Sequence, residues 1–188
     1  MRGMYYKLPR YVKIKNEKFI INTDYRIFIN FENDMQGLDK KKAVIKALTK
    51  FYGSAFSLII SKNLLEKAVE KFIWFYQCGK IQQFGSSKSS KSSKANIFNY
   101  EYDYDLIWAS YWMYAHIDIS TTKLHWWKFK SIWNALPSDC EFNKIKGYRG
   151  YTGKDKDILE LKEYYKLPPT AAEIEDQIRR DKIYEALK

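Results

Sequence analysis

The spacing of apolar residues constrains the fold of this chain most strongly, because it follows a helical period in most segments. The clearest case runs from Ser61 to Gln77, where one face is apolar and the other carries Lys and Glu. Ser61 is expected to cap this helix, and Gly79 is expected to end it. The pattern therefore predicts a mainly helical protein.

Apolar and polar residues alternate near the N-terminus. The alternation covers residues 11–15 and 18–22, on either side of a turn at Asn16 and Glu17. A period of two is typical of strands, so a small β-hairpin is predicted here.

Capping residues and apolar stripes predict the other helices. Asp24, Asp39 and Asp103 can each cap one helix, and Pro137 can end another. The helix that follows Asp103 is apolar around most of its circumference, so it is expected to be covered on several sides. The expected helices span about residues 24–35, 39–52, 103–116, 121–136, 139–146 and 155–166.

A last helix is predicted after two prolines at residues 168–169. Thr170 and Glu173 have the spacing of a capping box, in which each side chain bonds the backbone N–H of the other residue. Ile174 and Ile178 are apolar residues of this amphipathic helix, and they are candidate partner-binding residues. We expect the helix to project from the body of the protein.

The predicted fold class is mainly α (α+β), a helical bundle with a small N-terminal β-hairpin and a C-terminal amphipathic helix. A chain of 188 residues with 46% hydrophobic and 18% aromatic residues can build a core in one domain. We assign that domain to residues 1–168 and a helical extension to residues 169–188. Residues 81–96 are rich in Ser and Lys, which bury little, so a flexible loop is expected there.

Cysteine spacing and hydropathy favour a cytoplasmic protein. Cys78 and Cys140 lie far apart without CxxC spacing, which argues against a disulfide framework or a zinc site. No segment approaches the ~18 to 20 uninterrupted apolar residues that cross a bilayer, and residues 1–10 lack the apolar part of a signal peptide. No membrane association is expected.

Motifs for catalysis and cofactor binding are not found. The glycine-rich phosphate loops, the GxSxG elbow and the HExxH zinc motif do not occur. A metal-dependent hydrolase that uses Asp103, Asp105 and His125 is an alternative, although helix capping explains Asp103 without chemistry. We therefore expect no catalytic residue, no cofactor and no metal, and we predict that the protein is not an enzyme.

The densest aromatic stretch contains two adjacent tryptophans, Trp126 and Trp127. Side chains of adjacent residues leave a helix about 100° apart, so these two are not expected to share one core. We assign Trp127 to the core. Trp126, flanked by Lys123 and Lys130, is expected to be an exposed anchor for a partner.

Several segments of the chain resemble a known family. They are FYQCGK at residues 75–80, FNYEYD at 98–103, IDI at 117–119, LHWWKFK at 124–130 and GYR at 147–149. In order and spacing, over roughly Leu8 to Pro168, they resemble the phage gp fifteen protein family of Gram-positive phages and prophages. LHWWKFK is the most specific of these strings.

The resemblance implies a role in phage tail assembly. Members of this family look like tail assembly chaperones, encoded between the major tail protein and the tape-measure protein. The resemblance thus implies a non-enzymatic helper that binds the tape-measure protein and the major tail protein in the host bacterial cytoplasm. Such a helper is expected to be absent from the mature virion, and its self-association into a homo-oligomer is left open.

A nucleic-acid-binding module is the alternative function. The formal net charge is +11, and aromatic residues are interleaved with Lys, as in proteins that contact phosphates and stack on bases. However, most of the charge is scattered, and the lysine run at residues 40–42 is typical of a solvated helix face. Nucleic acid is therefore not the expected partner.

Overall fold

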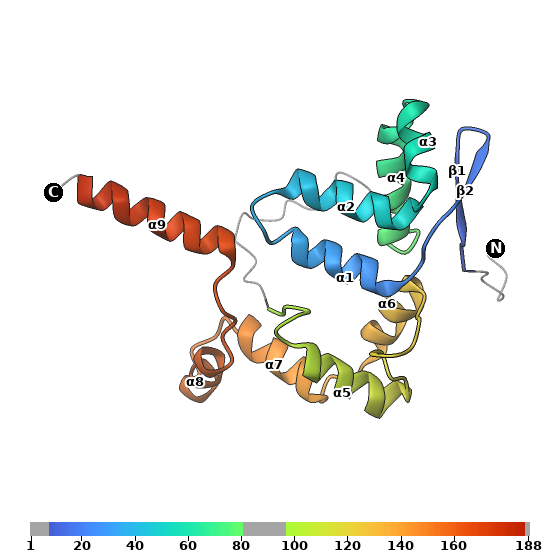
Figure 1. Ribbon diagram of the computed structural model, residues 1–188. Helices are drawn as coiled ribbons and strands as arrows, with labels where there is room; N and C mark the ends of the chain where they lie inside the picture. Colours follow the sequence, from blue (N-terminus) through green and yellow to red (C-terminus); the bar gives the residue numbers. More distant parts are fainter. Residues whose placement is uncertain (1–7, 81–96, 187–188) are drawn as a thin grey trace. The chain divides into compact units, whose positions relative to one another are not determined.

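The computed structural model describes residues 8–80 and 97–186, most of which are helical (Figure 1). The predicted mainly α fold with an N-terminal hairpin is confirmed. The segment expected to be a flexible loop, residues 81–96, lies outside the described residues. The elements are β1 (Tyr11–Ile14), β2 (Glu17–Ile20), α1 (Tyr25–Asp34), α2 (Lys40–Tyr52), α3 (Ala55–Ser61), α4 (Leu65–Tyr76), α5 (Tyr104–Ala115), α6 (Trp126–Ala135), α7 (Glu141–Gly150), α8 (Lys156–Tyr164) and α9 (Ala171–Ala186).

Contacts divide the described residues into two compact units. Unit 1 contains the hairpin, α3, α4, α2 apart from its first residue, most of α1 and the first part of α6. Unit 2 contains α5, α7, α8, α9 and the last residues of α1 and α6. The assignment of residues 1–168 to a single domain stays a prediction.

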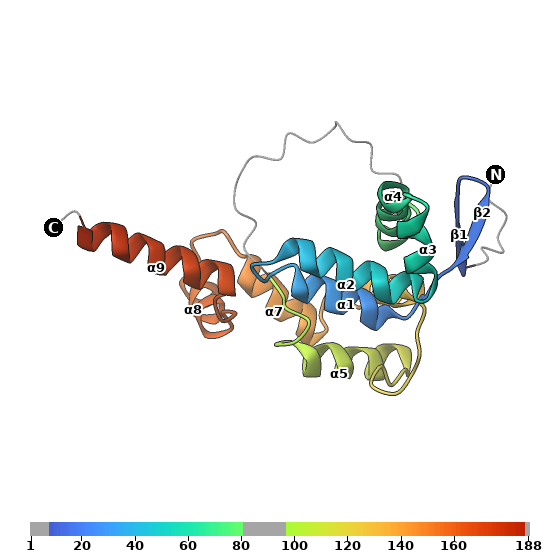
Figure 2. The same cartoon turned by 45° about the horizontal axis from the view of Figure 1, so that its top comes forward.

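The hairpin of unit 1 pairs β1 with β2 in antiparallel register (Figure 2). Val12 and Ile14 are buried in β1 and Phe19 is buried in β2, whereas the alternate residues are exposed. The turn is tighter than predicted. Lys15 adopts a left-handed conformation (φ 52°), and Glu17 already pairs with Ile14 across the strands.

The helix predicted from Ser61 to Gln77 begins too early. Ser61 instead ends α3, and its hydroxyl donates to the carbonyl of Leu58 at 2.9 Å. Asn63 then adopts a left-handed conformation (φ 53°), which Asn tolerates better than most residues, and α4 begins at Leu65. No helix is predicted over residues 55–60, so α3 is seen only in the structure.

The helix predicted from about residue 121 also begins later, at Trp126. The segment before it lies against the segment before α1, and Trp126 N donates to the carbonyl of Thr23 at 2.7 Å. His125 Nδ1 accepts from Trp127 N at 3.0 Å and so satisfies one of the free N–H groups at the start of α6. Long-range pairing of the backbone therefore replaces the first turn of the expected helix.

Aromatic rings form the core of unit 1. Phe28 is 0% exposed, and its ring centroid lies 4.9 Å from that of Trp126 and 5.6 Å from that of Phe72. Close ring pairs of this kind add stabilisation beyond the burial of their area. The other fully buried rings of this unit are those of Phe51, Phe75 and Phe129.

Gly79 follows α4 in a conformation that disfavours a side chain (φ +72°), and a Cβ there would lie 2.9 Å from Trp127 Cη2. Gly53 has a similar φ of +55° but open space around it. We expect Gly53→Ala to lower the free energy of unfolding by about 1 kcal/mol, from backbone strain alone. Gly79→Ala should lower it by about 1 kcal/mol more, because the indole must also move. Urea unfolding of both variants measures the difference. Equal losses of unfolding free energy would mean that the Trp127 indole moves aside without destabilising the protein.

In unit 2, α5 and α7 lie side by side in both views (Figures 1 and 2). A second aromatic cluster contains Phe98, Trp133 and Phe142, with the Trp133 and Phe142 centroids 4.8 Å apart. The Lys146 ammonium nitrogen lies 4.9 Å from the centre of the Phe142 ring. This cation–π contact lets a lysine stem pack against an aromatic core.

A buried ion pair joins the residue before α5 to α7. Arg149 Nη1 and Nη2 donate to the two carboxylate oxygens of Asp103 at 2.7 and 2.9 Å, and the side chains are 5% and 1% exposed. Arg149 Nε also donates to the carbonyl of Tyr165 at 2.6 Å. Asp103 precedes α5 as predicted, but its side chain makes no capping hydrogen bond. The prediction that Asp103 caps the helix is therefore wrong, because the buried arginine takes its carboxylate.

The capping box predicted for the last helix is confirmed. Thr170 N donates to Glu173 Oε2 at 2.7 Å, and Glu173 N donates to Thr170 Oγ1 at 3.3 Å.

Over residues 8–80 and 97–186, no single helix is long and apolar enough to cross a membrane. The helices α2 and α3 together are long and apolar enough, but they are bent by 118° where they meet.

Candidate protein-binding surfaces

Trp126 and Trp127, at the start of α6, are both buried. The prediction that Trp126 is an exposed anchor is wrong, since its exposed fraction is 0% and that of Trp127 is 5%. Their Nε1 atoms donate to the carbonyls of Tyr76 and Phe75 respectively, each at 2.8 Å. The last carbonyls of a helix lack helical partners, and those of adjacent residues lie about 100° apart around the axis. Two adjacent indoles can therefore bond two adjacent carbonyls of α4 and share one core.

The two lysines beside Trp126 have different surroundings. Lys123 is exposed, whereas Lys130 is half-buried, with its ammonium nitrogen 5.4 Å from the centre of the Trp126 ring. This cation–π contact covers the indole. Because Trp126 is buried, the lysines do not flank an aromatic anchor, and their part in partner binding stays a prediction.

Ile174 and Ile178 are exposed on α9, with exposed fractions of 47% and 50%. At about 100° per residue, Ile183 lies on the opposite side of the helix from Ile174. The apolar residues of α9 thus form two small patches instead of one stripe. Both candidate isoleucines are accessible to a partner, and their role in binding stays a prediction.

A further exposed surface lies on α5. One face of this helix carries Asp105, Trp108, Ala109, Trp112 and Met113, which recur at intervals of three and four residues and are here named the α5 outer stripe. Trp112 is 53% exposed and Met113 is 64% exposed. The rings of Trp108 and Trp112 stack on each other, with centroids 6.1 Å apart. The stripe is an apolar helix face with a carboxylate at its N-terminal end.

Asp118 adds a second carboxylate beside this stripe. Its Oδ1 accepts a hydrogen bond from Trp108 Nε1 at 2.9 Å and another from Ser120 N at 2.9 Å. Hydrogen bonds from the Ser120 hydroxyl and from the Trp108 indole lower the pKa of Asp118 to about 2. The carboxylate is therefore ionised throughout the neutral and mildly acidic range.

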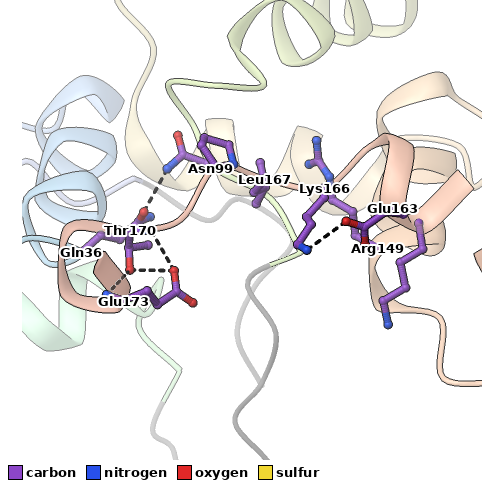
Figure 3. Close-up of a pocket in the computed structure, with 10 residues that line it drawn as sticks. Gln36, Asn99, Arg149, Glu163, Lys166, Leu167, Thr170 and Glu173 are labelled. Atoms are coloured by element: carbon purple, nitrogen blue, oxygen red, sulfur yellow. Dashed lines mark hydrogen bonds and ion pairs between the residues drawn. The ribbon is translucent and has the colours of Figure 1, made fainter. Parts of the chain in front are cut away.

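Unit 2 also contains a pocket of about 360 Å³, lined by side chains from α7, α8, the start of α9 and nearby loops (Figure 3). Its charged groups are engaged within the protein. Lys166 pairs with Glu163 at 3.0 Å, Glu173 accepts the capping-box bonds from Thr170, and Arg149 is held by the buried carboxylate. These partners favour a structural role for the lining over catalysis.

The residues of the hydrolase alternative have other contacts. Asp103 pairs with Arg149, and His125 Nε2 lies 3.1 Å from the carbonyl of Pro9. Burial lowers the pKa of His125, although its bond to Pro9 acts in the opposite direction. Among the residues that the structure describes, no three His, Cys, Asp or Glu side chains are grouped so that they could hold a metal ion.

Sequence reasoning missed the α5 outer stripe as a surface. The helix after Asp103 is expected from its composition to be covered on several sides, and the exposure of Trp112 and Met113 shows that this expectation is wrong. A signal was present in the charges. Residues 97–122 contain no Lys or Arg, in a chain that has 33 of them.

Comparison with known proteins gives one match. The family described as Bacteriophage Gp15 protein matches residues 4–170, which include most of both units and end just before α9. No curated protein and no solved structure matches the chain.

Proposed function

Because the chain belongs to the Bacteriophage Gp15 protein family, which matches residues 4–170, we propose that it is a non-enzymatic tail assembly chaperone. It binds the tape-measure protein and the major tail protein in the host bacterial cytoplasm and is absent from the mature virion. The family match is the observation that carries this proposal. The exposed apolar surfaces of α5 and α9 support it.

A tape-measure protein needs such a partner for a physical reason. A long helical protein that ends inside a tube exposes apolar stripes until the tube closes around it, and exposed stripes aggregate. A helper that packs its own apolar helix face on these stripes hides them reversibly. The α5 outer stripe, with Trp112 and Met113 more than half exposed, offers such a face.

The last helix offers a second contact. Residues 171–186 are exposed wherever their side chains are described, and Ile174 and Ile178 lie on one side of the helix. The helix follows two prolines, so it can engage a partner without uncovering either core. We assign it a supporting role in holding one of the two tail proteins.

Co-expression tests the proposed function. Produced together with the tape-measure protein of its own phage, this chain is expected to raise the soluble fraction of that protein and to co-purify with it. Deletion of residues 170–188 should weaken one of its contacts and leave the circular dichroism of the body unchanged. The measurement is the tape-measure protein in the soluble fraction, with and without the chaperone, on a calibrated gel.

The nucleic-acid alternative predicts a different result. Phosphate contacts release counterions, so the affinity for nucleic acid falls steeply as salt rises, whereas apolar packing depends only modestly on salt. If the tape-measure protein stays insoluble and an oligonucleotide binds tightly with a strong dependence on salt, the proposed chaperone function is wrong. The protein, with its net charge of +11, is then a nucleic-acid-binding module.

A further inference from the structure

We propose that the α5 outer stripe binds a cationic amphipathic helix, in which an apolar stripe is flanked by Lys or Arg. We take this helix to belong to the tape-measure protein, and only that assignment rests on the proposed function. The chemistry of the surface itself specifies the partner. Three observations carry the argument: the spacing of the stripe, its exposure and its charge.

The spacing makes α5 a helix with two apolar sides. Ile107 and Tyr111 face inward and are 2% and 0% exposed. The α5 outer stripe, which includes Trp108, Trp112 and Met113, forms the outward face, because its residues lie three or four positions apart and are therefore neighbours on the helix surface. The side chains of a second helix that lies along this face repeat with the same period. An outward face with helical spacing suits a partner helix better than an extended strand, which repeats every second residue.

The segment that carries the stripe has charged side chains of one sign at neutral pH. No Lys or Arg occurs in residues 97–122, where Glu101, Asp103, Asp105 and Asp118 supply carboxylates. Asp103 is neutralised by the buried Arg149, so the exposed carboxylates are those of Glu101 and Asp105, and the carboxylate of Asp118 is half-buried. The rest of the chain is strongly basic, since the whole chain carries a formal net charge of +11. The stripe therefore belongs to an acidic segment of a cationic protein.

A cationic helix fits both properties of the surface. Its apolar stripe can cover Trp112 and Met113, and its Lys or Arg side chains can reach the carboxylates of Asp105 and Asp118. The exposed indole face of Trp112 attracts the same cations through its π-electrons. A phosphate backbone or an acidic helix is repelled by the same carboxylates, so the surface discriminates between partners by charge as well as by shape.

Peptide binding to the full chain tests the inference without the tape-measure protein. The probes are two designed helical peptides with the same leucine stripe, one flanked by lysines and the other by glutamates, each with blocked termini and a fluorescent label. Fluorescence anisotropy is expected to show binding of the lysine peptide, although the protein carries a net charge of +11, and no binding of the glutamate peptide. Equal binding of both peptides, or binding of neither, overturns the inference.

Variants locate the site. Trp112→Ala is expected to weaken binding of the lysine peptide by about 10-fold or more, as at an aromatic hot spot, and Asp105→Asn by a few-fold. The control is Tyr164→Ala in α8, which removes an aromatic ring that is 80% exposed away from the stripe and should leave the affinity unchanged. Circular dichroism checks that each variant is folded.

The remaining outcomes are also decisive. If Trp112→Ala leaves the affinity unchanged, the peptide binds elsewhere and the inference is wrong. If sedimentation shows a dimer that Trp112→Ala dissociates, and the peptide does not compete with that dimer, the stripe binds a second copy of the chain instead. If the lysine peptide fails while co-expression still solubilises the tape-measure protein, the inference fails and the proposed function stands.

Discussion

Replacement of Trp126 by alanine is expected to lower the free energy of unfolding by about 3 to 5 kcal/mol. The side chain is 0% exposed, and its ring lies within 4.9 Å of Phe28 and 5.7 Å of Phe129 between centroids. The substitution leaves a large cavity at the centre of the aromatic cluster of unit 1, and it also removes the indole donor from the Tyr76 carbonyl. Urea unfolding followed by circular dichroism measures the loss.

Two matched variants separate the causes of this loss. Trp126→Phe keeps most of the ring packing but removes the Nε1 donor, so it should lower the free energy of unfolding by about 1 to 3 kcal/mol. Trp127→Ala should cost as much as Trp126→Ala, because Trp127 is 5% exposed and also donates to a carbonyl of α4. A loss below about 1 kcal/mol for Trp126→Ala would contradict the burial of this side chain.

Arg149→Met is expected to destabilise unit 2 by about 3 to 5 kcal/mol, because it leaves the carboxylate of Asp103 buried without its counter-charge. The pair is bidentate, with side chains 5% and 1% exposed. Arg149 also donates to the carbonyls of Tyr165 and Ile97, which lose these bonds in the variant. Thermal unfolding and urea unfolding should both report the change.

A double variant and a surface variant serve as controls. Asp103→Leu combined with Arg149→Met removes both charges, so the loss should be clearly smaller than the sum of the two single losses. Lys166→Met breaks the exposed pair with Glu163, whose side chains are 68% and 74% exposed, and should cost at most about 1 kcal/mol. Additive losses in the double variant would mean that the two charges do not interact strongly in the folded protein.

Local patterns were sufficient where the deciding interactions are local. The hairpin follows from alternation of Val12, Ile14 and Phe19, and the start of α9 follows from Thr170 and Glu173, which bond each other three residues apart. In both places the residues that determine the structure are neighbours in the sequence. Their spacing therefore carries the prediction.

The candidate site could be predicted only in part. The exposure of Ile174 and Ile178 agrees with their place on an isolated helix, whereas the exposure expected for Trp126 does not occur. The α5 outer stripe was not predicted. A helix that is apolar on most sides gives no sequence signal for which side other elements cover. The lack of Lys and Arg in residues 97–122 was the available signal for that surface.

The sequence by itself determined the mainly helical class, the hairpin, the last helix and the family, since each depends on short-range spacing or on strings such as LHWWKFK. Tertiary structure decided the hydrogen-bond and ion-pair partners of residues for which the local sequence allowed more than one arrangement. Asp103 could cap α5 but pairs with Arg149, and Trp126 could face solvent but bonds the end of α4. In each case a group distant in the sequence offers the buried side chain a hydrogen bond or a counter-charge, and leaving that side chain unpaired inside the protein would cost more than leaving the local alternative unmade.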